Sequence, residues 1–125
     1  MFTNKMIVRI AWLQEQVKDK YPDDLILNHL ITCTQVSKEV SEVLDCLPWK
    51  FERKMETVSR EHLLEELVDV FRFYVRLLII HNVTEKEFQE AFDSKSEIVE
   101  RRLCNGKSME ECLREEISRK TADNN

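Results

Sequence analysis

Four acidic residues form two pairs whose spacing could support metal chemistry. Glu39 and Glu42 stand three residues apart, and Glu66 and Asp69 repeat that spacing further along the chain. Residues three apart lie on one face of an α-helix, so each pair would present two carboxylates together. Carboxylate oxygens are the ligands that hard divalent cations prefer. The spacing therefore fits a metal site, but it fits two ordinary solvated acidic faces equally well.

The apolar residues beside these acids favour the metal site. Val36 and Val43 flank Glu39 on a helical wheel, and leucine and valine side chains flank Glu66. Charges so close to an apolar stripe are costly unless something compensates them. If the two helices pack antiparallel, the four carboxylates converge, and no set of arginines on the same faces would neutralise them. A divalent cation would do so, with Mg²⁺ as the default and Mn²⁺ as its substitute.

Two other kinds of metal site fit less well. A zinc site would recruit His29 and Cys33, which stand four apart, but no second ligand pair has a recognisable spacing. A di-iron bundle needs Glu-x-x-His on two helices, and none of the three histidines has a glutamate three residues before it. The four cysteines show no CxxC spacing, so we expect reduced thiols and a cytoplasmic protein.

Helices are expected to position the acidic pairs. Apolar periodicity and capping residues predict five of them, with a loop over 49–58 between the second and the third. The expected segments are 5–20, Asp23 or Asp24 to about 46, 59 to about 81 with Asn82 as a left-handed stop, 84 to the Asn105-Gly106 stop, and Ser108 to about 120. Capping boxes, Thr84-x-x-Glu87 and Ser108-x-x-Glu111, are expected to open the last two. Residues 121–125 are polar and predicted to be frayed. We expect a single all-α domain over residues 1–120, a bundle of four to five helices.

Composition excludes several functions. A chain of 125 residues fits one domain, and a single glycine with two prolines leaves little material for β-hairpins. A net charge of −5 argues against nucleic-acid binding, which normally needs a basic face. The longest apolar run, Leu77 to Ile80, is much too short to span a membrane.

Several motifs occur in the order typical of one enzyme superfamily. The segments 39–42 (EVSE), 48–50 (PWK) and 65–73 (EELVDVFRF) resemble those of all-α NTP pyrophosphohydrolases of the MazG/dimeric dUTPase type. Residues 95–106 are similar to the family's K-x3-N-x2-R-x2-N-G-Y element, and Leu13-Gln14 to the Leu-Gln of its first helix. The resemblance covers most of the chain, up to Gly106, and implies the helical bundle of that family.

The resemblance also implies functional roles. It implies Mg²⁺ ligands at Glu39, Glu42, Glu66 and Asp69. It implies phosphate contacts at Lys95 and Arg102, and a contact with the base at Gln14. Lys50 and Lys54 are substrate contacts or solvated charges, and Trp49 either stacks on the base or fills the core beneath the loop.

The expected reaction is hydrolysis of a (deoxy)nucleoside triphosphate, dUTP or another pyrimidine nucleotide, to the monophosphate and pyrophosphate. Glu39 or Glu42 would be the general base toward water. Three departures from the family pattern concern the substrate: Val99 replaces an asparagine that contacts the base, Lys107 replaces a tyrosine, and Arg72 replaces a histidine. The alternative is a non-catalytic helical interaction module.

A homodimer or higher homo-oligomer is expected as well. The third helix continues into an apolar segment, 71–80, that one small monomer cannot cover on every side.

Overall fold

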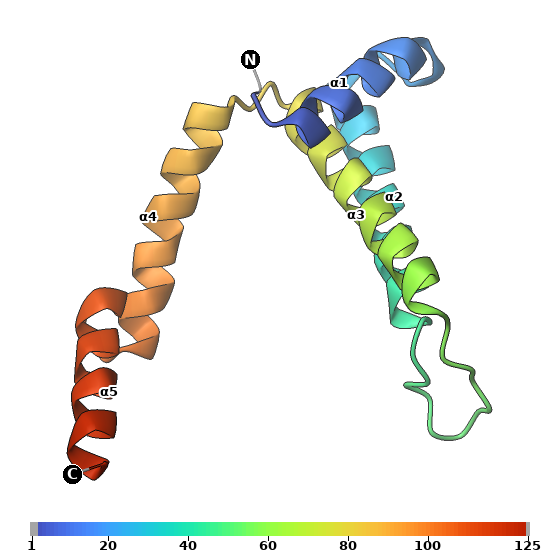
Figure 1. Cartoon of the computed structure of the whole chain (residues 1–125). Coiled ribbons are helices and arrows are strands. Elements are labelled where there is room, and N and C mark those ends of the chain that lie inside the picture. The colour runs from blue at the N-terminus through green and yellow to red at the C-terminus, as the bar shows by residue number, and fades with distance from the viewer. Residues whose placement is uncertain (1–2, 125) are drawn as a thin grey trace. The chain divides into compact units, whose positions relative to one another are not determined.

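The structure, a computed structural model, describes residues 3–124. Within this range the chain forms five α-helices and a short 3₁₀ turn, with no strand (Figure 1). The elements are α1 (Lys5–Val17), η1 (Lys18–Lys20), α2 (Leu25–Leu44), α3 (Arg60–Ile80), α4 (Glu85–Leu103) and α5 (Met109–Asp123). The all-α prediction is confirmed. None of these helices has an apolar stretch long enough to traverse a bilayer.

Side-chain caps set where the helices begin. Asp24 and Ser59 accept hydrogen bonds from the backbone N–H groups of Leu27 and His62, at 2.9 and 3.2 Å, and so start α2 and α3. Thr84 forms the complete capping box predicted for α4. At α5 only half of the predicted box forms: Ser108 Oγ accepts from the Glu111 N–H, and no return bond is found among the described residues.

Left-handed residues and a tightened turn set where the helices end. Asn82, with φ of 54°, follows α3, and Asn105-Gly106, with φ of 55° and 86°, follows α4, as predicted. The first helix is shorter than expected, because residues 18–20 tighten into η1. The last is longer, since α5 reaches Asp123 inside the segment predicted to be frayed, 121–125. Asn125 lies outside the described residues.

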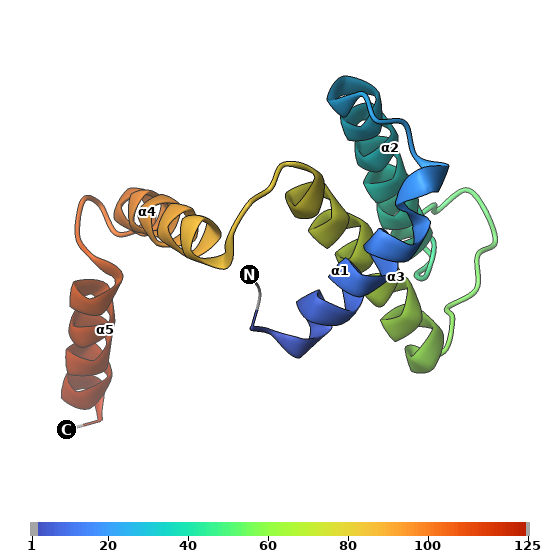
Figure 2. The same ribbon diagram turned by 90° about the horizontal axis from the view of Figure 1, so that it is seen from above.

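The chain divides into two compact units, Met1–Val83 and Thr84–Asn125. In the first unit α2 and α3 form an antiparallel hairpin, and α1 packs against α3 (Figures 1 and 2). The second unit contains α4 and α5, joined by a turn that the Lys107–Glu115 ion pair braces at 2.6 Å. The hairpin therefore positions the two acidic pairs.

The core of the first unit is small. Among the described residues, the fully buried apolar side chains are Ile10, Cys46 and Val75, and two polar side chains, Thr32 and Arg76, are buried with them. Other apolar side chains stay largely exposed, including Ile26 at 70% and Leu30 at 56% on α2, and Trp12 at 62% on α1. This unit buries little apolar surface to offset the conformational entropy lost on folding.

Candidate functional site

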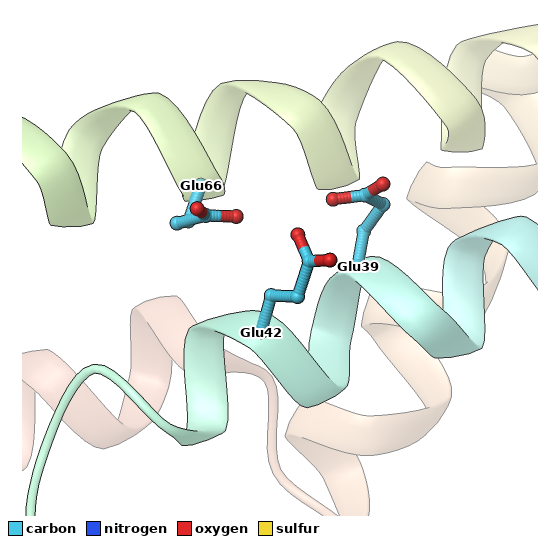
Figure 3. A group of neighbouring side chains, drawn as sticks. All are labelled: Glu39, Glu42 and Glu66. Atoms are coloured by element: carbon cyan, nitrogen blue, oxygen red, sulfur yellow. The ribbon is translucent and has the colours of Figure 1, made fainter.

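Three glutamates converge across the α2–α3 hairpin (Figure 3). Glu39 and Glu42 project from α2 and Glu66 from α3, and each offers a carboxylate oxygen within 4.8 Å of the other two. We call these three residues the acidic cluster. They meet because each pair lies on one helical face and the connection over residues 45–59 folds α3 back alongside α2. The predicted convergence is found for these three of the four acids.

Two oxygens of the acidic cluster have no hydrogen-bond partner. Glu39 and Glu66 are half-buried and Glu42 is exposed. Glu39 Oε2 and Glu66 Oε2 are shielded from solvent, yet neither is hydrogen-bonded by any described residue. A buried carboxylate oxygen without a partner is expensive and is explained by an ion or water that belongs at the site. The cluster thus fits a divalent cation, because all its donor atoms are carboxylate oxygens.

The electrostatics of the acidic cluster point the same way. Burial raises the pKa of Glu39 above its ordinary value, and the hydrogen bond with Glu42 and the neighbouring negative charges raise it further. For Glu66 the hydrogen bond with Glu42 is the larger cause of its raised pKa, followed by burial. His62, whose Nε2 lies 3.3 Å from Glu66 Oε1, opposes that rise. Without a cation the cluster resists carrying its full negative charge.

Asp69 lies close to this cluster but outside the group of three oxygens. It is half-buried on α3, one turn beyond Glu66. Its charge contributes to the raised pKa of both Glu39 and Glu66. Electrostatic coupling therefore links the fourth predicted ligand to the cluster.

Cys46 is a buried thiol that is hydrogen-bonded to the backbone of Glu42, a member of the acidic cluster. Its Sγ donates to the Glu42 carbonyl oxygen at 3.3 Å, and it is 2% exposed. Burial raises the pKa of the thiol, and the charges of Glu66, Asp45 and Glu42 raise it further. A protonated thiol is a poor nucleophile and a poor metal ligand, so Cys46 acts as packing. All four cysteines are free, as expected for reduced thiols.

The loop residues chosen from the sequence contact one another. Trp49 Nε1 donates to Asp45 Oδ1 at 3.0 Å, and Lys50 Nζ lies 4.9 Å from the Trp49 ring centroid. Trp49 is 43% exposed, so it does not fill the core as one reading of the sequence suggested. Its amphipathic ring is left available to stack on a ligand. Lys54 is exposed in the same loop.

The two predicted phosphate contacts lie in the second unit, on α4. Lys95 and Arg102 are seven residues apart, so they share one face of the helix, and Val99 lies between them on that face. Both basic residues are exposed. Lys95 and Val99 line a hollow of about 240 Å³ beside Phe92. Ser96 and the carboxylate of Glu100 line it too, so the hollow offers a ligand one cation beside one anion.

A buried arginine escaped the sequence analysis. Arg76, 3% exposed, donates from Nε to Thr32 Oγ1 at 3.2 Å, from Nη2 to Asn28 Oδ1 at 2.6 Å, and from Nη1 to Gln14 Oε1. The Tyr21 ring covers its guanidinium, with the central carbon 3.3 Å from the ring centroid. We call these five residues the arginine network.

A signal for this network existed in the sequence. Arg76 is the one charged residue in the segment 73–80, whose other side chains are apolar or aromatic. From the sequence alone this segment is interpreted as apolar, and Arg76 receives no role. A buried charge is costly unless other groups compensate it. Here the compensating groups are the side-chain oxygens of Gln14 on α1 and of Asn28 and Thr32 on α2, together with the Tyr21 ring, which follows η1.

Comparisons with known proteins place the chain in a family. A family model described as dUTPase matches residues 3–124, which is nearly the whole chain. No curated protein and no solved structure matches. The family match agrees with the all-α architecture. Because the match extends over almost every residue, the protein belongs to the all-α dUTPase family.

Proposed function

We propose that the protein hydrolyses a (deoxy)nucleoside triphosphate, dUTP or another pyrimidine nucleotide, to the monophosphate and pyrophosphate, with Mg²⁺ bound at the acidic cluster. The observation that carries this proposal is the pair of buried, unpartnered oxygens on Glu39 and Glu66. Membership of the dUTPase family supports nucleotide pyrophosphohydrolase activity. A bound cation would also offset the repulsion between these like charges, which the fold holds close together.

The metal ligands in this proposal are Glu39, Glu42 and Glu66, with Asp69 as the fourth. Mn²⁺ would substitute for Mg²⁺ because it prefers the same oxygen ligands. When bound, the cation would neutralise charge on phosphate oxygens and lower the pKa of a water molecule. Glu42 or Glu39 would accept the proton of the attacking water. The exposure of Glu42 supports it in this role, because solvent reaches its carboxylate.

The remaining substrate contacts come from side chains that the resemblance singled out. Lys95 and Arg102 would bind phosphate oxygens, which need cationic partners beyond the metal. Lys50 and Lys54 are further candidates. Trp49 and Gln14 would contact the base.

Base selectivity should be limited in this enzyme. Val99 stands where the family has a base-contacting asparagine, and an apolar side chain discriminates between bases only weakly. We therefore expect the preference for dUTP over dCTP and dTTP, measured as kcat/KM, to stay below about a thousandfold. A larger preference would show that other residues read the base without help from position 99.

Turnover of a panel of dNTPs with Mg²⁺, and with a chelator, tests the proposed activity. Pyrophosphate release that requires the cation supports it. The rival, a non-catalytic helical module, predicts no release and no metal effect on stability. Thermal unfolding separates the two further: a cation at a hundred times its Kd stabilises the folded state by about 2.7 kcal/mol. Glu66→Gln should lose that gain, whereas Glu97→Gln, the same change on exposed α4, should keep it.

We also infer that the chain forms at least a homodimer. The first unit buries few apolar side chains, while Ile26 and Leu30 of α2 remain more than half exposed. On α3, where the sequence suggested the interface, Phe71 and Tyr74 are less exposed, at 37% and 41%. Apolar patches of this kind mark association surfaces. Light scattering at micromolar concentration should give at least twice the monomer mass, and a monomer would contradict the inference.

A further inference from the structure

Two thiols lie together in the second unit, and the proposed nucleotide chemistry uses neither of them. Cys104 is the C-cap of α4, and Cys112 lies near the start of α5. Both are free and half-buried, and their side chains are hydrogen-bonded to each other. An oxidant in solution can reach such a pair, whereas Cys46 of the first unit is 2% exposed and protected by burial.

The turn between α4 and α5 brings the two thiols together. The Asn105-Gly106 stop, with left-handed φ values of 55° and 86°, reverses the chain directly after Cys104. The Lys107 N–H donates to the Cys104 carbonyl oxygen at 3.1 Å, and the Lys107 ammonium pairs with Glu115 at 2.6 Å. Glu115 follows Cys112 by three residues, so the two share one face of α5, which this ion pair holds toward the end of α4.

The surroundings of the two sulfurs give them different reactivity. The hydrogen bond with Cys112 is the largest cause of the raised pKa of Cys104, about 11, followed by burial and nearby negative charge. Cys104 therefore keeps its proton at neutral pH and donates this hydrogen bond, which the Cys112 sulfur accepts. The Lys107 ammonium interacts electrostatically with Cys112. A sulfur that accepts a hydrogen bond beside a cation is the better nucleophile of the two.

A disulfide fits this pair better than a metal ion does. A structural metal needs about four ligands. Among the residues that the structure describes, no third carboxylate, imidazole or thiol atom lies within 4.8 Å of both sulfurs. Two thiols in hydrogen-bond contact, in contrast, need to approach by only roughly 1–2 Å to reach an S–S length of about 2.05 Å.

We propose that Cys104 and Cys112 are a reversible redox pair, in which hydrogen peroxide oxidises Cys112 first and the resulting disulfide links α4 to α5 and stabilises the hairpin. The Cys112 thiolate attacks the peroxide and the O–O bond breaks. One oxygen stays on Cys112 as a sulfenic acid, and the other leaves as hydroxide and takes up the proton that Cys112 released. The Cys104 sulfur then attacks the Cys112 sulfur, the S–O bond breaks, and the Cys104 proton leaves with that oxygen. Two thiols and one hydrogen peroxide thus give one disulfide and two waters.

The disulfide matters because little else holds α5 against α4 within the second unit. Neither helix has a fully buried side chain among the described residues. Phe92 and Leu103 on α4 and Ile117 on α5 are all more than half exposed. A covalent link between residues 104 and 112 restricts the unfolded chain and so stabilises the hairpin. The proposal is independent of the proposed function, since it needs neither nucleotide nor cation.

Peptide mapping of the full chain tests the disulfide. Trypsin cleaves after Lys107, so the two cysteines fall in separate peptides, 103–107 and 108–114. After treatment of the reduced protein with hydrogen peroxide, we expect these two peptides to be joined and a dithiol reductant to separate them. The intact mass should be that of a single chain less two hydrogens. Two unreacted thiols, or a link only between chains, would overturn the proposal.

Single serine variants test the order of the two steps. Cys104→Ser keeps the proposed nucleophile without its partner, so a sulfenic acid should persist on Cys112 and be trapped by a cyclic 1,3-diketone. Cys112→Ser should give no such adduct on Cys104 under the same conditions. Cys33→Ser is the matched control, because Cys33 is also free and half-buried, and this variant should form the disulfide at the wild-type rate. An adduct on Cys104 that forms as fast as the one on Cys112 would contradict the proposed order.

Amide hydrogen exchange measures the stabilisation. In the wild-type protein, oxidation should slow exchange in α5 by about tenfold or more and leave α2 unaltered, because the link closes only the second unit. In Cys104→Ser the same treatment should leave exchange in α5 as it was. Unaltered exchange in oxidised wild type, despite a complete disulfide, would overturn the stabilising role. No nucleotide or metal is present, so these outcomes do not depend on whether the protein hydrolyses dNTPs.

Discussion

The acidic cluster and the arginine network both use α2 and α3, but the cluster gathers like charges whereas the network surrounds one buried cation with neutral partners. In the cluster, like charges are held within 4.8 Å, and two buried oxygens have no partner. In the network, a single buried cation has Nε and both terminal nitrogens bonded to neutral acceptors and its face covered by a ring. Unmet hydrogen-bonding capacity indicates a site that awaits a ligand, whereas a satisfied group indicates a part that holds other residues in place.

This contrast determines whether removing a charge from each region raises or lowers the free energy of unfolding. Removing a charge from the acidic cluster relieves repulsion in the metal-free protein and should not destabilise it. Removing the guanidinium from the network leaves three acceptors on α1 and α2, the side-chain oxygens of Gln14, Asn28 and Thr32, without this donor. Variants of the acidic cluster should therefore lose activity and keep their stability, whereas variants that remove the guanidinium should lose stability.

The largest effect is expected for Asp69→Asn. The change keeps the shape of the side chain but removes a negative charge next to the acidic cluster, so the cation should bind more weakly and be misplaced. Phosphoryl chemistry depends on positioning and charge stabilisation, so pyrophosphate release should fall at least a hundredfold, on the order of 3 kcal/mol in the barrier. Steady-state kinetics with Mg²⁺ measures this.

Thermal unfolding is the companion measurement for Asp69→Asn. Without metal the variant should melt at or above the wild-type temperature, and it should lose most of the stabilisation by Mg²⁺. Wild-type turnover in this variant would exclude Asp69 as a ligand and leave the site with the three glutamates alone.

The next effect is a loss of stability in Arg76→Met. Methionine fills much of the same volume but leaves the acceptors of Gln14, Asn28 and Thr32 unpaired, at about 1–3 kcal/mol for each one that stays buried. We expect a net loss of roughly 3 kcal/mol in urea unfolding. Arg72→Met is a matched control on the same helix and should change stability by less than about 0.5 kcal/mol. Equal losses of stability in both variants would show that the hydrogen bonds of Arg76 contribute no more to stability than an ordinary arginine on this helix does.

The sequence predicted the elements well because helix ends are decided locally. Asp24, Ser59 and Thr84 cap helices through bonds to backbone groups only a few residues away. Asn82 ends a helix through its own left-handed conformation. The convergence of Glu39 with Glu66 was predictable on the condition that α2 and α3 pack antiparallel, because each acid lies beside the apolar stripe of its own helix.

The arginine network could not be derived from spacing. Asn28 and Thr32 share one face of α2, but Gln14, Tyr21 and Arg76 come from distant positions that no local periodicity relates. Gln14 was singled out only through a family resemblance, and its amide orientation follows from a partner 62 residues away. The different solvent exposure of the three glutamates could not be predicted from spacing either. Glu42 shares a helical face with Glu39, yet Glu42 is exposed and Glu39 is half-buried.

The smallest effect concerns the pH dependence of stability without metal, and it distinguishes two kinds of carboxylate. The raised pKa values of Glu39 and Glu66 mean that the folded state binds protons more tightly than the unfolded state. Their contribution to stability is fully present below about pH 4.3, the ordinary glutamate pKa, and is lost as the pH rises through the raised values. Glu115 behaves oppositely, because its hydrogen bond and ion pair with Lys107 lower its pKa. Its contribution to stability therefore appears as the pH rises and is lost in acid.

Urea unfolding in the presence of a chelator, between pH 4 and pH 7, tests both directions. As the pH rises, the wild-type protein should lose stability relative to Glu39→Gln and gain stability relative to Glu115→Gln. Saturating Mg²⁺ should reverse the first trend and leave the second unaltered, because a cation binds the deprotonated cluster. If Mg²⁺ leaves the first trend as it was, the three glutamates are a strained acidic face and not a metal site.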